Sequence, residues 1–310
     1  MKLLTRSDEI HFFLLYINFM IYVVMGPTCS GKTSVANAIM DKLNCYAINF
    51  DAFQIYKDMD IGTSKLEKSD PHYPRYRLLD IVTPDKSFSV MEFQKRCREE
   101  IDKCLKENKD VVLVGGTGLY LRATLYDYEF PVEEEKDDSD LEELDNHTLY
   151  YMLQKMDYEA SLKIHENNRK RLIRAISMIR NSDVTKSERI NSQKHELIYP
   201  EVRFLFLSPD RETLYKNINA RVIEMVDMGL VDEVKSLLEK YDLSLTSRQG
   251  IGYKEIMDFL RGNCSLDEAI ELIQKRTRNY AKRQVTFFKN QFQYELFTSK
   301  EELLNSIKEN

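Results

Sequence analysis

Several signatures of other protein classes are missing from this sequence of 310 residues. It has no C-x-x-C pair and no H-E-x-x-H motif, and its five cysteines are odd in number, which argues against zinc sites and disulfide frameworks and fits reduced thiols. The longest apolar stretch, Leu14 to Met25, is too short to span a bilayer, and no signal-peptide cleavage site follows it. We therefore expect a cytoplasmic protein with no membrane attachment.

The net charge of −6 argues by itself against a nucleic-acid partner. The average is misleading, however, because the stretch from Glu129 to Asp145 holds ten acidic residues and one lysine and so carries −9. The rest of the chain is left with +3. A locally basic cleft on such a protein can still hold a phosphate backbone.

One motif, from Gly26 to Thr33, fits G-x-x-x-x-G-K-[ST], the phosphate-binding P-loop. It follows a β-branched apolar run and precedes an expected helix, which is the context that the motif needs. Backbone N–H groups at a helix N-terminus favour an anion, Lys32 adds a positive charge, and the Thr33 hydroxyl can reach a magnesium ion. The motif predicts binding of a di- or triphosphate; a chance match to an ordinary strand–helix turn is the alternative.

Alternating strands and helices predict the fold class. From Met20 to about Tyr128 the pattern is βαβ, which implies a parallel sheet. We therefore expect an α/β fold: a P-loop-type doubly wound parallel sheet with an α-helical insert and a helical C-terminal part. The expected parts are a dispensable N-terminal extension at 1–19, with Met20 as the native start, a core of 20–128 and 200–310, and a helical insertion domain at 129–199.

The expected elements are these. Strands are predicted at Ile21–Met25, Cys45–Phe50, Arg77–Val82, Val111–Val114 and, as the last core strand, Arg203–Leu207. Helices are predicted at Lys32–Leu43, Ser89–Lys106, Gly118–Leu125, Thr148–Met156, Tyr158–His165, Asn168–Arg180, Arg211–Met228 and Leu230–Lys240. A long helix opens with the capping box Ser265-Leu266-Asp267-Glu268 and runs to about Gln291.

Two polar residues follow other predicted strands, at the sheet edge where α/β proteins bind ligands. Asp51 can ligate magnesium or act as a general base, and an N-cap for the next segment is the alternative. Thr117 lies in Gly115-Gly116-Thr117-Gly118, which is either a ligand contact or simply a tight turn. The strand before it ends without Asp or Glu, so it is not a Walker B strand, and ATP hydrolysis that drives movement is disfavoured.

Basic residues form two clusters. Lys275, Arg278, Lys282 and Lys289 make one stripe along the long C-terminal helix, and a second cluster spans Arg169–Arg174 in the insert. On charge alone, each is as well explained by a solvated helix face as by contact with a phosphate backbone.

At this point the segments from Ile21 to about Gln291 resemble the tRNA dimethylallyltransferase (tRNA isopentenyltransferase) family. Met59–Lys65 is similar to the family's M-D-I-G-T-A-K, and the A-K-R-Q block at Ala281–Gln284 is also far more specific than a P-loop alone. Other similar segments include Gly26–Thr33, Asp51–Tyr56, Pro71-His72, Leu79–Ile81, Phe88–Val90, Phe93, Gly115–Tyr120, Ile164–His165, Asn168, Arg171, Arg174, Arg221, Gly250–Glu255 and Thr277–Tyr280.

The resemblance implies a reaction. Dimethylallyl diphosphate, the co-substrate, donates its allyl group to the exocyclic amine of the adenosine immediately 3′ of the anticodon in tRNA, and pyrophosphate is released. The implied catalytic residues are Asp51, which takes the amine proton, Thr117, which positions the acceptor, and Arg221, with magnesium held near Thr33. The implied partner is the anticodon stem-loop of tRNA, and we expect a monomer.

The resemblance also implies two sets of binding residues. The diphosphate set is Gly26, Pro27, Thr28, Cys29, Ser30, Gly31, Lys32, Thr33 and Arg221. The tRNA set is Asp51, Ala52, Phe53, Gln54, Thr117, Lys170, Arg171, Leu172, Ile173, Arg174, Gln249, Gly250, Ile251, Gly252, Tyr253, Lys254, Thr277, Arg278, Lys282, Arg283 and Gln284.

Three alternatives and three departures accompany this interpretation. An adenylate isopentenyltransferase acting on free nucleotide would need neither basic cluster. A small-molecule P-loop kinase is disfavoured because this sequence lacks the nucleotide-base and lid signatures of such kinases. A phosphate-binding regulator would not need Asp51.

Ala52 replaces the usual serine, so we expect altered affinity. Phe287 stands where tryptophan is common, which should affect packing only. The run Glu129–Asp145 is shorter and more acidic than usual, so no RNA contact is expected there.

Overall fold

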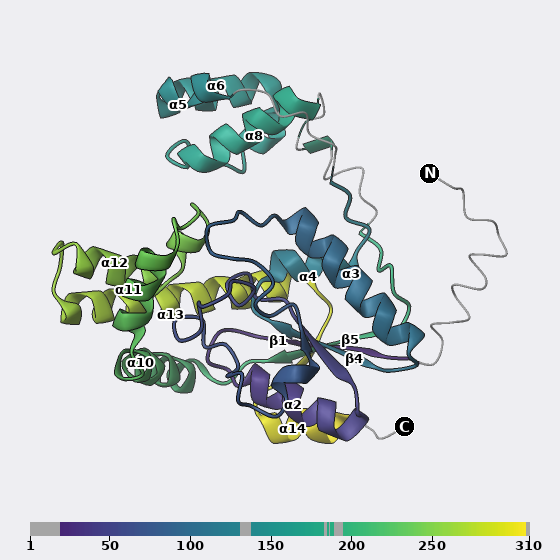
Figure 1. The fold of residues 1–310 in the computed structure, drawn as a ribbon. Helices are drawn as coiled ribbons and strands as arrows, with labels where there is room; N and C mark the ends of the chain where they lie inside the picture. Colours follow the sequence, from purple (N-terminus) through teal and green to yellow (C-terminus); the bar gives the residue numbers. More distant parts are fainter. Residues whose placement is uncertain (1–18, 131–137, 183–184, 186, 189–194, 308–310) are drawn as a thin grey trace, which may run out of the picture. The chain divides into compact units, whose positions relative to one another are not determined.

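Figure 1 shows the computed structural model of the chain, which describes residues 19–130, 138–182, 185, 187–188 and 195–307. These fall into two compact units. The first comprises the residues up to Leu125 together with those from Tyr199 onward, and the second is Tyr126–Ile198. Residues 1–18, where most of the expected N-terminal extension falls, and 131–137, in the acidic run, lie outside the described residues.

A parallel sheet forms the centre of the first unit (Figure 1), which confirms the expected fold class. In the described residues its strand order is β3-β2-β4-β1-β5-β6, and every neighbouring pair is parallel. The residues of β1 and β4 are all buried, because helices cover both faces of a parallel sheet and its strands are apolar throughout. The strands are β1 Ile21–Met25, β2 Tyr46–Asn49, β3 Tyr76–Arg77, β4 Val111–Gly115, β5 Val202–Leu207 and β6 Glu295–Phe297.

Helices cover both faces of this sheet (Figure 1). On one face lie α2 (Lys32–Leu43) and α14 (Lys300–Ser306), whose apolar side chains pack with the strands into a buried cluster. On the other face lie α3 (Val90–Lys106) and α4 (Gly118–Leu125), which contact each other. The P-loop therefore enters a helix that is anchored in the core along its whole inner side.

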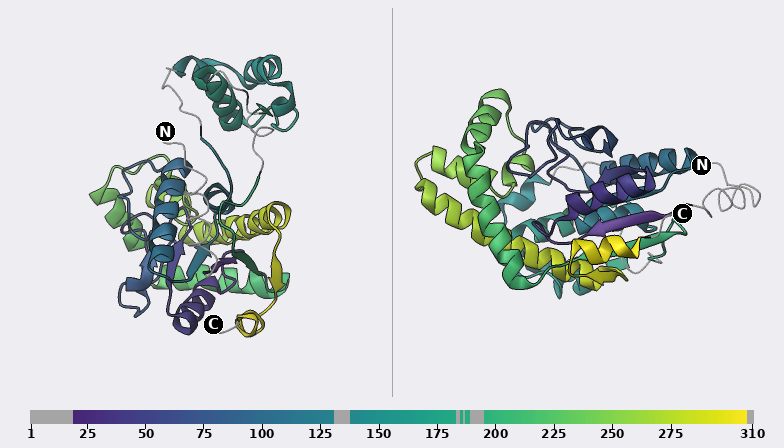
Figure 2. Two further views of the ribbon diagram at one scale, coloured as in Figure 1. Left: turned by 90° about the vertical axis from the view of Figure 1, so that its right-hand side faces the viewer. Right: turned by 90° about the horizontal axis from the view of Figure 1, so that it is seen from below.

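The C-terminal helices gather at one end of the sheet (Figures 1 and 2). α13 begins at the predicted capping box, in which Ser265 and Glu268 each accept the other's backbone N–H. It packs against α10, α12 and α4. Gly229, with φ of 101°, separates α10 from α11 in the left-handed conformation that favours glycine. The helices are α10 Arg211–Asp227, α11 Leu230–Lys240, α12 Tyr253–Leu260 and α13 Leu266–Gln291.

The second unit is helical and has its own apolar core, which includes Leu149, Leu153, Leu172 and Ile176. The Arg169 guanidinium donates to the backbone oxygens of residues 141 and 142 at 3.2 and 2.6 Å, so it satisfies carbonyl groups near the end of the unit's first helix. Among its described residues the helices are α5 Ser139–Glu143, α6 Asn146–Met156, α7 Tyr158–Ser161 and α8 Arg169–Ser182.

Most expected elements are confirmed to within two residues, and three expectations are wrong. The strand expected at Arg77–Val82 ends at Arg77, because Leu78 and Asp80 have φ of 61° and 54°, which a strand cannot hold. The helix expected to reach His165 ends at Ser161. β5 is not the last strand, since β6 pairs beside it. The short helices α5, α12 and α14 were not predicted.

Candidate active site

The P-loop joins β1 to α2 at the carboxyl edge of the sheet. No side chain fits at Gly26, because a Cβ atom there would lie 2.2 Å from the backbone oxygen of Leu207. Gly31 has φ of 90° and, as the N-cap of α2, brings no side chain to the first N–H groups of the helix. Such N–H groups at a helix N-terminus attract an anion.

A pocket of about 870 Å³ opens beside the P-loop. Lys32, Asp51 and Arg221, which lie far apart in the sequence, all line it. They come from α2, from the segment that follows β2, and from α10. The lining is rich in charged and hydroxyl groups, and it includes Thr28, Thr33, Ser34, Thr63, Ser64 and Lys65.

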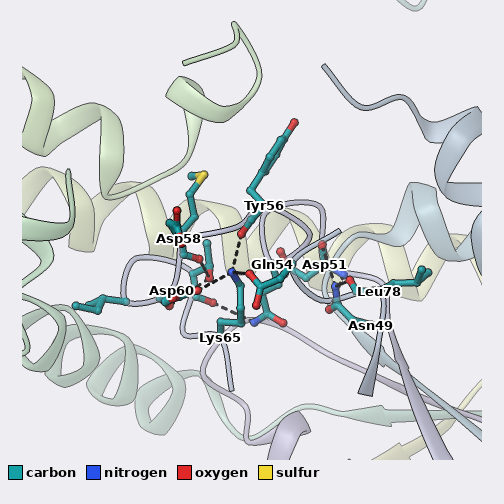
Figure 3. A network of polar contacts seen from close by, with 12 residues as sticks. Asn49, Asp51, Gln54, Tyr56, Asp58, Asp60, Lys65 and Leu78 are labelled. Carbon is teal, nitrogen blue, oxygen red and sulfur yellow. Dashed lines mark hydrogen bonds and ion pairs between the residues drawn. The ribbon is translucent and has the colours of Figure 1, made fainter. Parts of the chain in front are cut away.

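Asp51 is held by the turn that it forms (Figure 3). Its backbone N–H donates to Oδ1 of Asn49 at 3.0 Å, and its own Oδ1 accepts from the N–H of Phe53 at 2.9 Å. This local hydrogen bond closes a turn and orients the carboxylate; residues 52–55 form turns, so the helix N-cap considered as an alternative in the sequence is not formed. Thr117 lies next to it, because its Oγ1 accepts from the N–H of Ala52 at 3.0 Å.

Burial sets the proton affinities in this pocket. It lowers the pKa of Lys32 to about 8, an effect that the nearby Asp51 carboxylate opposes. It also raises the pKa of Asp51, against the hydrogen bond from Phe53 and the charge of Lys32. The pocket thus holds a carboxylate that is more basic than usual beside an ammonium that loses its proton more readily than usual.

A smaller, mostly apolar pocket of about 110 Å³ adjoins the first. The two share Asp51, Ser64 and Arg221 in their linings. Arg221 is fixed at this junction, because its Nε donates to Oγ of Ser64 at 3.0 Å and its Nη1 donates to Glu224 at 2.8 Å. The apolar lining includes Phe53, Ile218, Val222, Met225, Ile251, Ile273 and Tyr280.

Three residues that were expected to contact tRNA have buried side chains, and two of them, Tyr253 and Gln284, line the pockets. Leu172 is fully buried in the core of the second unit, and the Tyr253 hydroxyl, also buried, donates to Glu233. Gln284 is only 5% exposed. Its Oε1 accepts from the N–H of Thr28 and its Nε2 donates to the oxygen of Gly116, both at 2.9 Å. Gln284 is therefore a bridge between the P-loop and the end of β4.

Most of the other residues expected to contact tRNA lie at the surface or beside the pockets. Lys170, Arg171 and Arg174 are exposed on α8, and Lys282 and Arg283 are exposed on α13. Of the rest, Gln249 is exposed, Ile173 and Lys254 are half-buried, and Gly252 is buried. The apolar pocket is lined by Gly250, Ile251 and Thr277. Two others make side-chain hydrogen bonds: Arg278 donates to Asn219, and Gln54 donates to the oxygen of Thr63 at 3.0 Å.

The buried ammonium of Lys65 was not predicted from the sequence to have a role (Figure 3). The Lys65 side chain is 1% exposed, and its Nζ donates to the oxygen of Tyr56 at 2.6 Å and to carboxylates of Asp60 and Asp80 at 2.7 and 2.6 Å. These three acceptors satisfy the ammonium fully. The available signal was the family-like segment Met59–Lys65, whose lysine had been given no role.

Comparison with known proteins decides the family. Residues 54–291 match the model of the family described as IPP transferase. The chain belongs to this family. Among curated members, the tRNA dimethylallyltransferase of Bacillus licheniformis is 40% identical over 278 residues, which cover 87% of this chain and 88% of that protein. The corresponding protein of Anoxybacillus flavithermus is 39% identical over 279 residues and 89% of each chain.

Solved structures of IPP transferases share the fold. The tRNA delta(2)-isopentenylpyrophosphate transferase of Staphylococcus epidermidis has a TM-score of 0.68 and 35% identity, covering 93% of this chain and 97% of that one. A eukaryotic dimethylallyltransferase acting on tRNA has a TM-score of 0.75 and 28% identity, covering 87% of this chain and 69% of that one. These likenesses favour the leading interpretation over the kinase and the free-nucleotide alternatives.

Proposed function

We propose that this member of the IPP transferase family is a tRNA dimethylallyltransferase. It transfers the dimethylallyl group of dimethylallyl diphosphate to the exocyclic amine of the adenosine immediately 3′ of the anticodon. The observation that carries the proposal is that a polar pocket beside the P-loop and an apolar pocket meet at Asp51 and Arg221. A donor with a charged head and a hydrocarbon tail fits such a pair of pockets.

The donor's two halves take different pockets. The diphosphate lies in the polar pocket, against the N–H groups that begin α2 and the ammonium of Lys32. The five-carbon tail takes the apolar pocket, whose volume of about 110 Å³ is somewhat below the roughly 150 Å³ of an apolar cavity that holds benzene. This assignment places the bond that breaks next to Asp51.

The reaction then follows from the charges around that bond. The amine nitrogen of adenosine forms a bond to the first carbon of the donor, the bond from that carbon to the diphosphate oxygen breaks, and Asp51 accepts the proton that the amine loses. The raised pKa of Asp51 makes it a better base than an ordinary carboxylate. Lys32 and Arg221 stabilise the negative charge that develops on the leaving pyrophosphate.

Magnesium is part of this proposal. In the described part of the chain, no group of three or more His, Cys, Asp or Glu residues could hold a metal ion by itself. Magnesium usually takes only one or two protein oxygens and completes its shell with substrate phosphates and water. The Thr33 hydroxyl, which lines the pocket beside Lys32, suits that role. When bound, the ion would neutralise diphosphate charge.

The tRNA contacts and the location also remain proposals. The acceptor adenosine must leave its stack to reach a pocket, as in other base-modifying enzymes. The exposed cations of α8 and α13, among them Lys170, Arg171, Arg174, Lys282 and Arg283, suit the phosphate backbone of an anticodon stem-loop.

No described helix has the length and apolar character needed to cross a membrane. We place a monomeric enzyme in the cytoplasm, because its substrate is there and its cysteines are free thiols.

The lowered pKa of Lys32 predicts the alkaline limb of the pH profile. Because kcat/KM reports the free enzyme, we expect kcat/KM for the donor to fall as the pH rises through about 8, where Lys32 loses its charge. A bound diphosphate stabilises the ammonium, so kcat should fall only at higher pH. The raised pKa of Asp51 moves the acid limb above the ordinary carboxylate range. Initial rates measured across the pH range test this, and identical alkaline limbs for kcat and kcat/KM would contradict it.

A direct assay tests the function. The chain is incubated with radiolabelled dimethylallyl diphosphate and either undermodified tRNA or AMP, and the nucleosides of the anticodon loop are analysed by mass. We expect label in the tRNA, at the adenosine 3′ of the anticodon, and none in AMP. Labelling of AMP alone would identify an adenylate isopentenyltransferase, and phosphorylation of a small molecule from ATP would identify a kinase.

A further inference from the structure

A carboxylate from α11 binds the backbone of a loop that lines the donor pockets. Oε2 of Glu233 accepts from the N–H groups of Asp60 and Ile61 at 3.0 and 2.7 Å. Oε1 accepts from the N–H of Gly62 at 3.1 Å and from the Tyr253 hydroxyl at 2.7 Å. One side chain therefore receives four hydrogen bonds, which is close to the full capacity of a carboxylate.

The three consecutive N–H groups form a concave nest of the kind that binds anions. Here the anion is built into the protein. Hydrogen bonds to an ionised acceptor are roughly twice as strong as neutral ones, so Glu233 is a strong clamp for this part of the loop. Lys65 forms the other end of the loop, and its ammonium donates to the carboxylate of Asp60, the first residue of the loop, at 2.7 Å (Figure 3). Opposite charges thus fix both ends of the segment Asp60–Lys65, which we call the clamped loop.

The clamped loop bears on the chemistry through Ser64. This residue has φ of 52°, a left-handed value that a serine seldom adopts without support from its surroundings. Its Oγ accepts from Nε of Arg221 at 3.0 Å, and both residues line both pockets. Gly62 admits no side chain, since a Cβ atom there would lie 2.6 Å from the Tyr253 ring. The loop is therefore packed against α12 and cannot shift without moving the partner of Arg221.

We propose that Glu233 is a positioning residue of the donor site. Its carboxylate sets the path of the clamped loop and, through Ser64, the direction in which Arg221 faces the diphosphate. The inference rests on the proposed function, because it assumes that a diphosphate occupies the polar pocket. A merely structural Glu233 would affect the stability of the fold and would leave diphosphate affinity unchanged.

The test measures pyrophosphate binding by calorimetry, because this readout needs no turnover. In Glu233→Gln the shape is kept, but the charge is lost and an NH₂ group that cannot accept faces the loop's donors. Hydrogen bonds to charged groups are worth enough that we expect pyrophosphate affinity, and kcat/KM for the donor, to fall by about 10–100-fold. The tRNA affinity should stay near that of the wild type, while the melting temperature falls, because the loop's N–H groups and the Tyr253 hydroxyl lose part of their acceptor. Glu239→Gln, an exposed glutamate on the same helix, is the matched control and should behave as wild type.

A double-mutant cycle separates positioning from stability. If Glu233 acts through Ser64, the double variant Glu233→Gln/Ser64→Ala will lose less pyrophosphate binding free energy than the two single variants lose together. Additive effects, an unchanged affinity in Glu233→Gln, or an equal loss of donor and tRNA binding with a lowered melting temperature would each overturn the proposal.

A milder variant covers the case in which Glu233→Gln does not fold. Tyr253→Phe removes one hydrogen-bond donor to Glu233 and keeps the ring, so a smaller loss of pyrophosphate affinity is expected, and no loss overturns the proposal. A wild-type chain that binds pyrophosphate tightly but prenylates no tRNA would refute the proposed function and leave this inference to be decided by the same variants.

Discussion

Asp51→Ala is expected to slow prenyl transfer by about 10²–10⁴-fold, the usual contribution of a general base, while tRNA binding is largely kept. The reason is that Asp51 lines both pockets, where the donor's reacting carbon is proposed to lie, and that burial makes its carboxylate unusually basic. Single-turnover rates at saturating donor and tRNA report the chemical step directly. Filter binding of labelled tRNA then shows whether the RNA complex persists.

The asparagine variant sharpens this test. In Asp51→Asn the side-chain oxygen can still accept the hydrogen bond that Phe53 donates at 2.9 Å, so the turn is kept while the basicity is lost. We expect Asp51→Asn to be nearly as slow as Asp51→Ala. The control is Asp232→Asn, whose side chain is 81% exposed. Near-normal turnover in Asp51→Asn would remove Asp51 from the mechanism and reduce it to a residue that shapes the turn.

The sequence predicted the fold where the local signal was long and regular. The apolar runs of β1 and β4 and the strongly periodic helices, such as α3 and α13, were confirmed with bounds within one residue. It failed at β3, because left-handed backbone at Leu78 and Asp80 interrupts a run that looks extended in sequence. It also missed β6, which has three residues at the sheet edge and owes its place to β5 rather than to its own composition.

The candidate site was predicted unevenly for a related reason. A motif indicates which residues are present, and the P-loop with Asp51 was found because strand ends converge at one edge of the sheet. A motif does not indicate where a side chain points, so the bridge that Gln284 makes between Thr28 and Gly116 was not predicted. Glu233 was missed because three of its four partners lie about 170 positions away in the sequence and are backbone groups, which leave no signal in residue type.

Replacing Lys32 by methionine is expected to lower kcat/KM for the donor by about 10²–10³-fold, the range found when one preorganised stabiliser of developing charge is removed. Lys32 lies in a partly dry pocket, where a positive charge acts on the diphosphate with less screening than in water. Methionine keeps most of the length of the side chain and is uncharged, so the loss reports mainly the charge. The alkaline limb at about pH 8 should disappear with it, because the titrating group is gone.

The matched control for this variant is Lys42→Met on the same helix. The Lys42 ammonium donates to the oxygen of Ile307 at 2.7 Å and does not line the pocket, so donor kinetics should be unchanged. Lys32→Arg should recover only part of the activity, since a guanidinium is broader and planar where the loop holds a compact ammonium 2.7 Å from the oxygen of Pro27. Pyrophosphate binding as tight as in the wild type, with the alkaline limb still present in Lys32→Met, would place the diphosphate elsewhere and would remove the physical basis for assigning the polar pocket to it.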